Sequence, residues 1–83
     1  MTDGVTIAAP SVGRFYRAPN PGAPFFVDVG DEVTPDTTVC IIEVMKLMNS
    51  ITAGTSGTVT QVLVGDAEPV DAGEVLIVID PNG

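Results

Sequence analysis

Seven short runs rich in valine, isoleucine and threonine are the feature that most restricts the fold of this chain. Such residues favour strands, and proline or glycine lies in or beside most of the gaps between the runs. The runs span residues 5–8, 13–17, 25–29, 38–44, 47–53, 57–62 and 74–79. No long i, i+3, i+4 apolar stripe escapes interruption by glycine or proline, so we predict an all-β fold with essentially no helix.

The length and charge of the chain limit its organisation and its partners. Its 83 residues suffice for one compact unit, so we expect a single domain over residues 1–83. Three basic and eleven acidic residues give a formal net charge of -8, which repels nucleic-acid phosphates and anionic lipids. No apolar stretch approaches the roughly 18 residues of a membrane span. We therefore expect neither nucleic acid nor a membrane as a partner.

The reactive residues are few. Cys40, the only cysteine, lies in the apolar run 39–42, which predicts a buried free thiol and a cytoplasmic location. With one cysteine and no histidine, the chain lacks the residues for a Cys/His zinc site or a Ser-His-Asp triad. We therefore expect no metal site and no catalytic residues.

The two halves of the chain resemble each other. The Val-Gly-Asp of residues 29–31 recurs at 64–66, and the apolar run 39–42 recurs at 75–78. Gly13 matches Gly57 at a wider spacing, so the first half carries an insert of about nine residues, placed at the proline-rich segment 16–24. Two like halves, each too small to bury a face alone, predict two sheets packed face to face about a pseudo-twofold axis.

Met45 and Lys46 lie between two of the predicted strands, where the chain must reverse. Two-residue hairpin turns require positive φ, which favours Asn-Gly or Asp-Gly, and Met-Lys is disfavoured there by about 1–2 kcal/mol. An unfavoured turn indicates a functional demand.

Lys46 is the only lysine in the chain. A hairpin tip exposes its amine on a flexible stem, where it can be acylated. Because lysine amines are almost all protonated at neutral pH, such acylation would need an enzyme. Exposed lysines often serve solubility alone, but a chain with no other lysine offers a modifying enzyme one target.

Residues 43–48, Glu-Val-Met-Lys-Leu-Met, resemble the attachment motif of biotinyl domains, commonly Glu-Ala-Met-Lys-Met. Together with the segment 15–19, Phe-Tyr-Arg-Ala-Pro, they make the chain similar to the biotinyl domains of acetyl-CoA carboxylase carriers over nearly all of residues 5–80. Val44 and Leu47 depart from the usual alanine and methionine, but both remain apolar.

The resemblance implies a specific fold. It is a flattened β-barrel or barrel-sandwich of two four-stranded antiparallel sheets, with the attachment lysine on a hairpin turn. The insert at 16–24 corresponds to a protruding loop called the thumb, which lies near the biotin arm in that family. The thumb residues in this chain are Tyr16, Arg17, Ala18, Pro19, Asn20, Pro21 and Gly22.

The resemblance also implies a function. A biotin protein ligase would attach biotin covalently to Lys46; a biotin carboxylase would load the arm with a carboxyl group; and a carboxyltransferase would pass that group to acetyl-CoA for fatty acid synthesis. The chain would be a carrier and not an enzyme. The residues expected to form the turn and the surface that the ligase reads are Glu43, Val44, Met45, Leu47 and Met48. For Met48, a place in the core is favoured over a contact, and for Glu43 a solvated carboxylate is an equally good account.

Two alternatives remain open at this point. Lipoyl carrier domains of 2-oxoacid dehydrogenases share the fold and the hairpin lysine, although their counterpart of Met45 is generally aspartate. An unmodified barrel-sandwich interaction domain is the second alternative, and the lone lysine at the tip argues against it.

Overall fold

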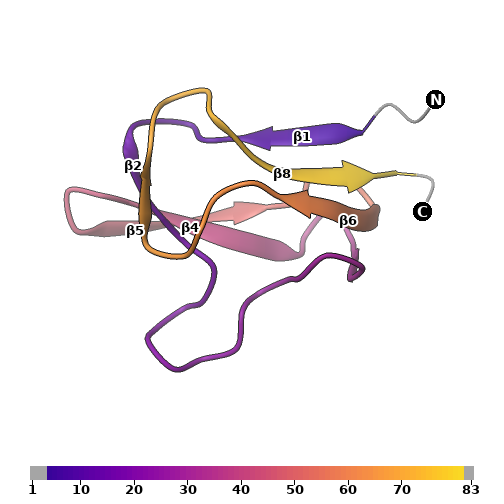
Figure 1. The fold of residues 1–83 in the computed structure, drawn as a ribbon, viewed down its shortest axis with the longest axis horizontal. Coiled ribbons are helices and arrows are strands. Elements are labelled where there is room, and N and C mark those ends of the chain that lie inside the picture. The colour runs from indigo at the N-terminus through magenta and orange to yellow at the C-terminus, as the bar shows by residue number, and fades with distance from the viewer. Residues whose placement is uncertain (1–3, 82–83) are drawn as a thin grey trace.

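The computed structural model describes residues 4–81, which form strands and loops (Figure 1). The eight strands are β1 (Val5–Ala8), β2 (Gly13–Tyr16), β3 (Glu32–Val33), β4 (Thr38–Val44), β5 (Leu47–Thr52), β6 (Gly57–Val62), β7 (Glu68–Val70) and β8 (Val75–Asp80). Residues 4–81 contain no helix, and therefore none long and apolar enough to cross a membrane. The predicted all-β class is confirmed for the described part of the chain.

The strands form two four-stranded antiparallel sheets, ordered β1-β8-β6-β3 and β5-β4-β2-β7. The two orders correspond strand by strand. If β1 is matched with β5, β2 with β6, β3 with β7 and β4 with β8, one sheet order becomes the other. This correspondence is the pseudo-twofold relation that the sequence repeat predicted, and it confirms the two-sheet sandwich.

Gly13 and Gly57, which the repeat makes equivalent, perform the same task in the two halves. A Cβ atom on Gly13 would lie 2.6 Å from the carbonyl oxygen of Glu43 in β4. A Cβ atom on Gly57 would collide with the carbonyl oxygen of Asp80 in β8. Each glycine therefore permits the close approach of the strand that completes its own half of the sandwich.

The core lies between the two sheets. Its fully buried side chains come from both halves of the chain, namely Phe15, Val39, Cys40, Ile42, Val59, Leu76, Ile77 and Ile79. Burial raises the pKa of the Cys40 thiol from 9.0 to about 12, because the low-polarity surroundings disfavour the thiolate. The expectation of a buried free cysteine is confirmed.

Six of the seven predicted strands are present with ends shifted by at most one residue, but the strand predicted at 25–29 is wrong. Its backbone polar groups bond elsewhere: the amide of Phe26 donates to the Arg17 carbonyl, the Val27 carbonyl accepts from the Arg17 guanidinium, and the amide of Asp28 donates to Asp31. These three groups are therefore not available for a sheet ladder. The two shortest strands, β3 and β7, were not anticipated.

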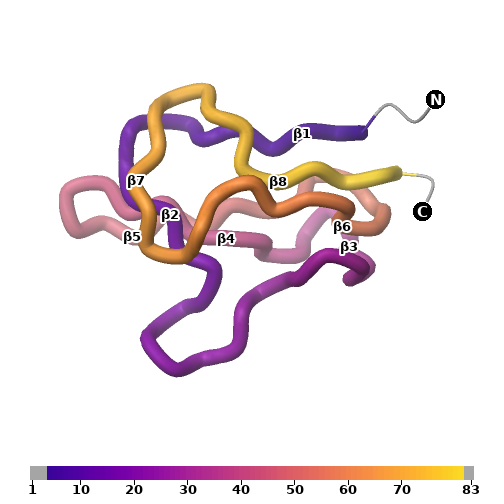
Figure 2. The backbone as a smooth tube through the Cα atoms, in the orientation of Figure 1, coloured from indigo at the N-terminus to yellow at the C-terminus, as the bar shows by residue number. Residues whose placement is uncertain are grey.

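The segment 16–24, here called the thumb, begins at the end of β2. Figure 2 shows the chain leaving the sandwich after β2, projecting as a loop and returning before β3. The described chain measures 38 × 26 × 20 Å, and the β4–β5 turn lies at the opposite end from the start of β1 and the end of β8 (Figure 1).

Candidate attachment site at the β4–β5 hairpin

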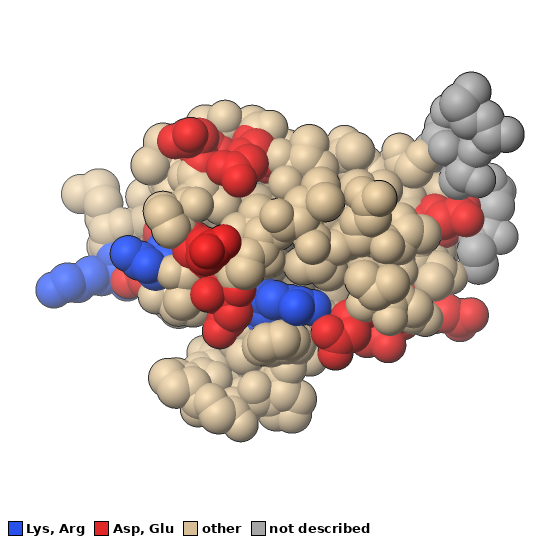
Figure 3. Space-filling view, viewed as in Figure 1, with Lys and Arg blue, Asp and Glu red and all other residues tan. Residues whose placement is uncertain are grey.

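The β4–β5 hairpin ends in a two-residue turn with Lys46 at its tip. Val44 pairs with Leu47, and between them Met45 and Lys46 have φ angles of 52° and 67°. Positive φ at both central residues matches the primed hairpin turn that the sequence predicted, so neither residue has the backbone that its side chain favours. Blue side-chain atoms project beyond the surface at this end of the molecule in Figure 3.

Large apolar side chains flank Lys46 in full view of solvent. Met45 is 91% exposed, Leu47 is 69% exposed and Met48 is 52% exposed. The expected core position for Met48 is therefore wrong. Contiguous exposed apolar side chains are typical of surfaces that bind other macromolecules. Val44 is half-buried and packs against the core, so it supports the hairpin from within.

Glu43 joins the hairpin to the base of the thumb. It is half-buried, and its carboxylate oxygen Oε1 accepts a hydrogen bond of 3.0 Å from the Tyr16 hydroxyl. This hydrogen bond is the largest cause that raises the pKa of Tyr16, with burial and the charges of Glu43 and Asp66 adding to it and Arg14 opposing it. Glu43 is therefore not a freely solvated carboxylate, which was one of the two interpretations that the sequence left open.

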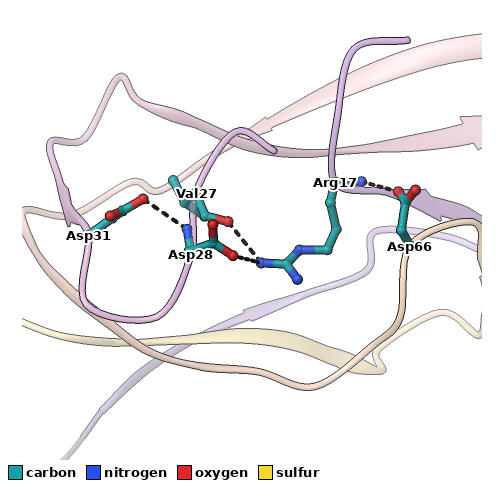
Figure 4. A network of polar contacts seen from close by, with 5 residues as sticks. All are labelled: Arg17, Val27, Asp28, Asp31 and Asp66. Carbon is teal, nitrogen blue, oxygen red and sulfur yellow. Dashed lines mark hydrogen bonds and ion pairs between the residues drawn. The ribbon is translucent and has the colours of Figure 1, made fainter. Parts of the chain in front are cut away.

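Arg17 fastens the two ends of the thumb together (Figure 4). Its guanidinium donates to the Val27 carbonyl and to Asp28, both at 2.9 Å, and lies 4.2 Å from the centre of the Phe25 ring. Its backbone amide donates to the Asp66 carboxylate at 2.7 Å, and its carbonyl accepts from Phe26 at 2.7 Å. The thumb therefore leaves the sandwich through a closed and hydrogen-bonded base.

A groove of about 490 Å³ lies between the thumb and the hairpin. It brings together Tyr16, Glu43 and Met48 from the sheet with most of the thumb, whereas the Arg17, Val44, Met45, Lys46 and Leu47 side chains do not line it. Its lining residues are Tyr16, Ala18, Pro19, Asn20, Pro21, Gly22, Ala23, Phe25, Glu43, Met48, Asp66 and Ala67.

Asp66 and Ala67 form a wall of this groove that the sequence reading did not single out. Ala67 has φ 68°, its amide donates to the Phe15 carbonyl at 2.7 Å, and its carbonyl accepts from Arg14 at 2.6 Å. These bonds hold the loop after β6 against β2 in a conformation unfavourable for alanine. The repeated Val-Gly-Asp triplet was the available signal. It makes Asp66 the counterpart of Asp31, which follows the thumb in the sequence.

A family model described as "Biotin-requiring enzyme" matches residues 5–79, which is nearly the whole chain. The chain belongs to this family of biotin-requiring enzymes. The structure places Lys46 at the tip of the two-residue hairpin turn that the sequence predicted, while its role as an attachment point and the roles of the surrounding residues stay predictions.

Relatives of this biotin-requiring family member include carriers and carboxylases. It is 53% identical over 76 residues to the biotin carboxyl carrier protein of acetyl-CoA carboxylase of Nostoc sp., covering 92% of this chain and 42% of that protein. It is 49% identical over 79 residues to the protein of the same name from Pyropia yezoensis, covering 95% of this chain and 50% of that protein. It superposes on Kluyveromyces lactis urea carboxylase with a TM-score of 0.78 at 30% identity, covering 95% of this chain and 6% of that one.

The family member spans about half the length of the two curated carriers it matches here. The superposition on a solved carboxylase supports the barrel-sandwich fold implied by the resemblance.

Proposed function

We propose that this chain carries carboxyl groups on a biotin joined by an amide bond to the Nζ atom of Lys46. One observation carries the proposal: the only lysine of the chain occupies the exposed tip of a hairpin turn whose backbone suits neither of its residues. The names of the curated relatives, carriers of acetyl-CoA carboxylase, support the same reading.

The residues at the site suit a biotin group. Lys46 is exposed, so its amine is open to acylation, and the groove begins beside the hairpin at the facing pair Glu43 and Met48. A groove of about 490 Å³ falls within the usual range of small-molecule sites, and its mainly apolar wall carries the Tyr16 hydroxyl and the Asn20 amide. Lys46 would hold the group and the thumb would restrain its ring.

Biotin, when bound, supplies a ureido nitrogen that takes up a carboxyl group. The chain itself contributes position and surface. The turn points the Lys46 arm away from the sandwich, Met45 and Leu47 offer an apolar surface to a biotin protein ligase, and tethering raises the local concentration of the arm at its partners. The partners in this proposal are a biotin carboxylase and a carboxyltransferase acting on acetyl-CoA, in the cytoplasm, with the chain acting as a carrier and not as a catalyst.

Intact mass spectrometry tests the proposal. Coexpression with an active biotin protein ligase and excess biotin should add one biotinyl mass to the chain and none to Lys46→Arg. A lipoyl mass would support the lipoyl alternative instead. An unchanged mass for the wild-type chain, or full labelling of Lys46→Arg, would contradict the proposal.

A further inference from the structure

The groove beneath the thumb has a charge of one sign. Glu43 and Asp66 line it, and among residues 4–81 no lysine or arginine does. The two nearby arginines are engaged elsewhere: Arg17 with Val27 and Asp28, and Arg14 with the carbonyl of Ala67. The rest of the wall is largely apolar, with Met48, Phe25 and the thumb prolines.

Tyr16 lines the groove, and its pKa responds to these charges. The hydrogen bond to Glu43 raises the pKa of its hydroxyl, burial adds to this, and the charges of Glu43 and Asp66 raise it further. Arg14 acts in the opposite direction and does not reverse the shift. Of these causes, the charges of Glu43 and Asp66 are the ones that would also act on an anion brought into the groove from outside.

The groove lies within reach of an arm on Lys46. Glu43 and Met48 face each other across β4 and β5, three and two residues from Lys46 along the chain. At the rise of a β-strand this is a separation of roughly 10 Å or less, which a lysine stem extended by an acyl chain can span by folding back. The groove is lined by Tyr16 of β2, Glu43 of β4 and Met48 of β5, which are neighbouring strands of one sheet, together with residues of the thumb.

We propose that this groove holds the acylated Lys46 arm when the arm ends in a neutral, hydrogen-bond-donating ring, and excludes the arm when its end bears a carboxylate. The inference rests on the proposed function and deepens it. A cyclic urea can donate N–H groups to the Glu43 and Asp66 carboxylates, whereas a carboxylate meets two like charges. An empty carrier would then keep its arm against the thumb, and a loaded carrier would release it toward a partner.

The single tyrosine makes the groove directly observable. The chain contains one tyrosine, Tyr16, and no tryptophan, so its fluorescence and its phenol titration report this groove alone. Lys46 of the full chain can be acylated chemically with activated biotin or with an activated aliphatic arm of matched length that ends in a carboxylate. Lys46→Arg, treated identically, accounts for labelling of the N-terminal amine.

In the wild-type chain at low salt, the biotin arm should change the Tyr16 emission and shift its titration, and the carboxylate arm should leave both near their unmodified values. Two like charges a few ångströms away should lower occupancy of the groove by the carboxylate arm by about tenfold or more. At 1 M salt, where the screening length is about 3 Å, the carboxylate arm should recover part of the signal.

Asp66→Asn should let the carboxylate arm produce the signal, because it removes a charge and keeps an oxygen that can accept from the Arg17 amide. Asp71→Asn is the matched control, since Asp71 is exposed and does not line the groove. Glu43→Gln provides a second test should Asp66→Asn fail to fold.

Three results would overturn the inference: equal Tyr16 changes with both arms in the wild-type chain, no change with the biotin arm, or the same behaviour in the groove variants and in Asp71→Asn. Because the arms are attached chemically, failure of ligase labelling would contradict the proposed function and leave this experiment intact.

Discussion

Two residues at the β4–β5 turn adopt a backbone conformation that their side chains disfavour. Met45 and Lys46 both have positive φ without being glycine or asparagine, a conformation that costs about 1 kcal/mol or more per residue. The sequence predicted this from the turn position alone, because a two-residue hairpin leaves little choice of backbone. Ala67, with a similar φ, was not predictable, since its conformation depends on bonds to the distant residues Phe15 and Arg14.

Met45→Gly should raise the free energy of unfolding and slow biotinylation. Glycine adopts positive φ freely, and the side chain removed is 91% exposed, so a gain of roughly 0.5 kcal/mol is expected after the entropy that glycine adds to the unfolded chain. Urea unfolding measures the stability, and mass spectrometry during ligase treatment measures the labelling rate. Ala67→Gly relieves the same strain away from the turn and should be labelled at the wild-type rate; equal slowing in both variants would contradict the assigned role of Met45.

Cys40 should make stability depend on pH in the alkaline range. Its pKa is raised from 9.0 to about 12, so the folded state keeps its proton after the unfolded chain has lost it. The contribution is fully present below pH 9 and is lost as the pH rises toward 12, at up to about 1.4 kcal/mol per pH unit.

Comparing urea unfolding of the wild-type chain and Cys40→Ala from pH 8 to about pH 11 isolates this contribution, because the other titrating groups are common to both. The wild-type advantage should shrink as the pH rises. A difference that stays constant would contradict a protonated Cys40 in the folded state.

At the scale of whole elements, the sequence predicted strands wherever β-branched residues alternate or run together, and it failed where side chains replaced the ladder. The segment 25–29 has strand-like composition, yet its Val27 carbonyl and Asp28 amide form hydrogen bonds with the side chains of Arg17 and Asp31. β3 and β7 are only two and three residues long, too short to show a period in the sequence. The groove was likewise hidden, because the thumb, the hairpin and the loop after β6 meet only in three dimensions.

Arg17→Ala should loosen the thumb without unfolding the sandwich. The variant loses two side-chain hydrogen bonds and the stacking on Phe25, while its ion-pair partner Asp28 is 67% exposed, so a loss of about 1–2 kcal/mol is expected. Amide hydrogen exchange should accelerate at Phe26 and Ala23, whose amides bond within the thumb and its base, and stay slow in β6 and β8.

Arg14→Ala is the control for this prediction. It removes the same charge and one hydrogen bond, to Ala67, without touching the thumb ends. Faster exchange at Phe26 in both variants would show that charge, and not the Arg17 contacts, holds the thumb.

At the scale of the whole molecule, the acidic charge is spread over the surface and is not confined to one site (Figure 3). Acidic side chains are spread over the face shown in Figure 3, and the formal net charge is -8 before any acylation of Lys46. Acylation removes one positive charge and makes the surface more acidic. A domain with such an acidic surface suits partners with basic rims, which attract it from a distance.

Association of the biotinylated chain with a biotin carboxylase should therefore weaken as salt rises. The association rate constant, measured by stopped flow between 50 mM and 500 mM salt, should fall several-fold, because the screening length shortens from about 14 Å to about 4 Å. The same measurement on a variant with Asp36 and Asp71 changed to asparagine should show a shallower slope. A rate independent of ionic strength would exclude electrostatic steering.

The pseudo-twofold order gives β8 and β1 the same relation as β4 and β5, since each pair lies side by side at the border of its sheet. In one pair the chain runs directly from strand to strand, through the turn that bears Lys46; the other pair joins the first and the last strand of the described residues. The architecture thus has two corners of the same construction, and only one of them is closed by a turn. A circular permutation that closed the second corner with Met-Lys and opened the chain at the thumb would give the sandwich a second Met-Lys tip, at the end opposite Lys46, while preserving every strand pairing.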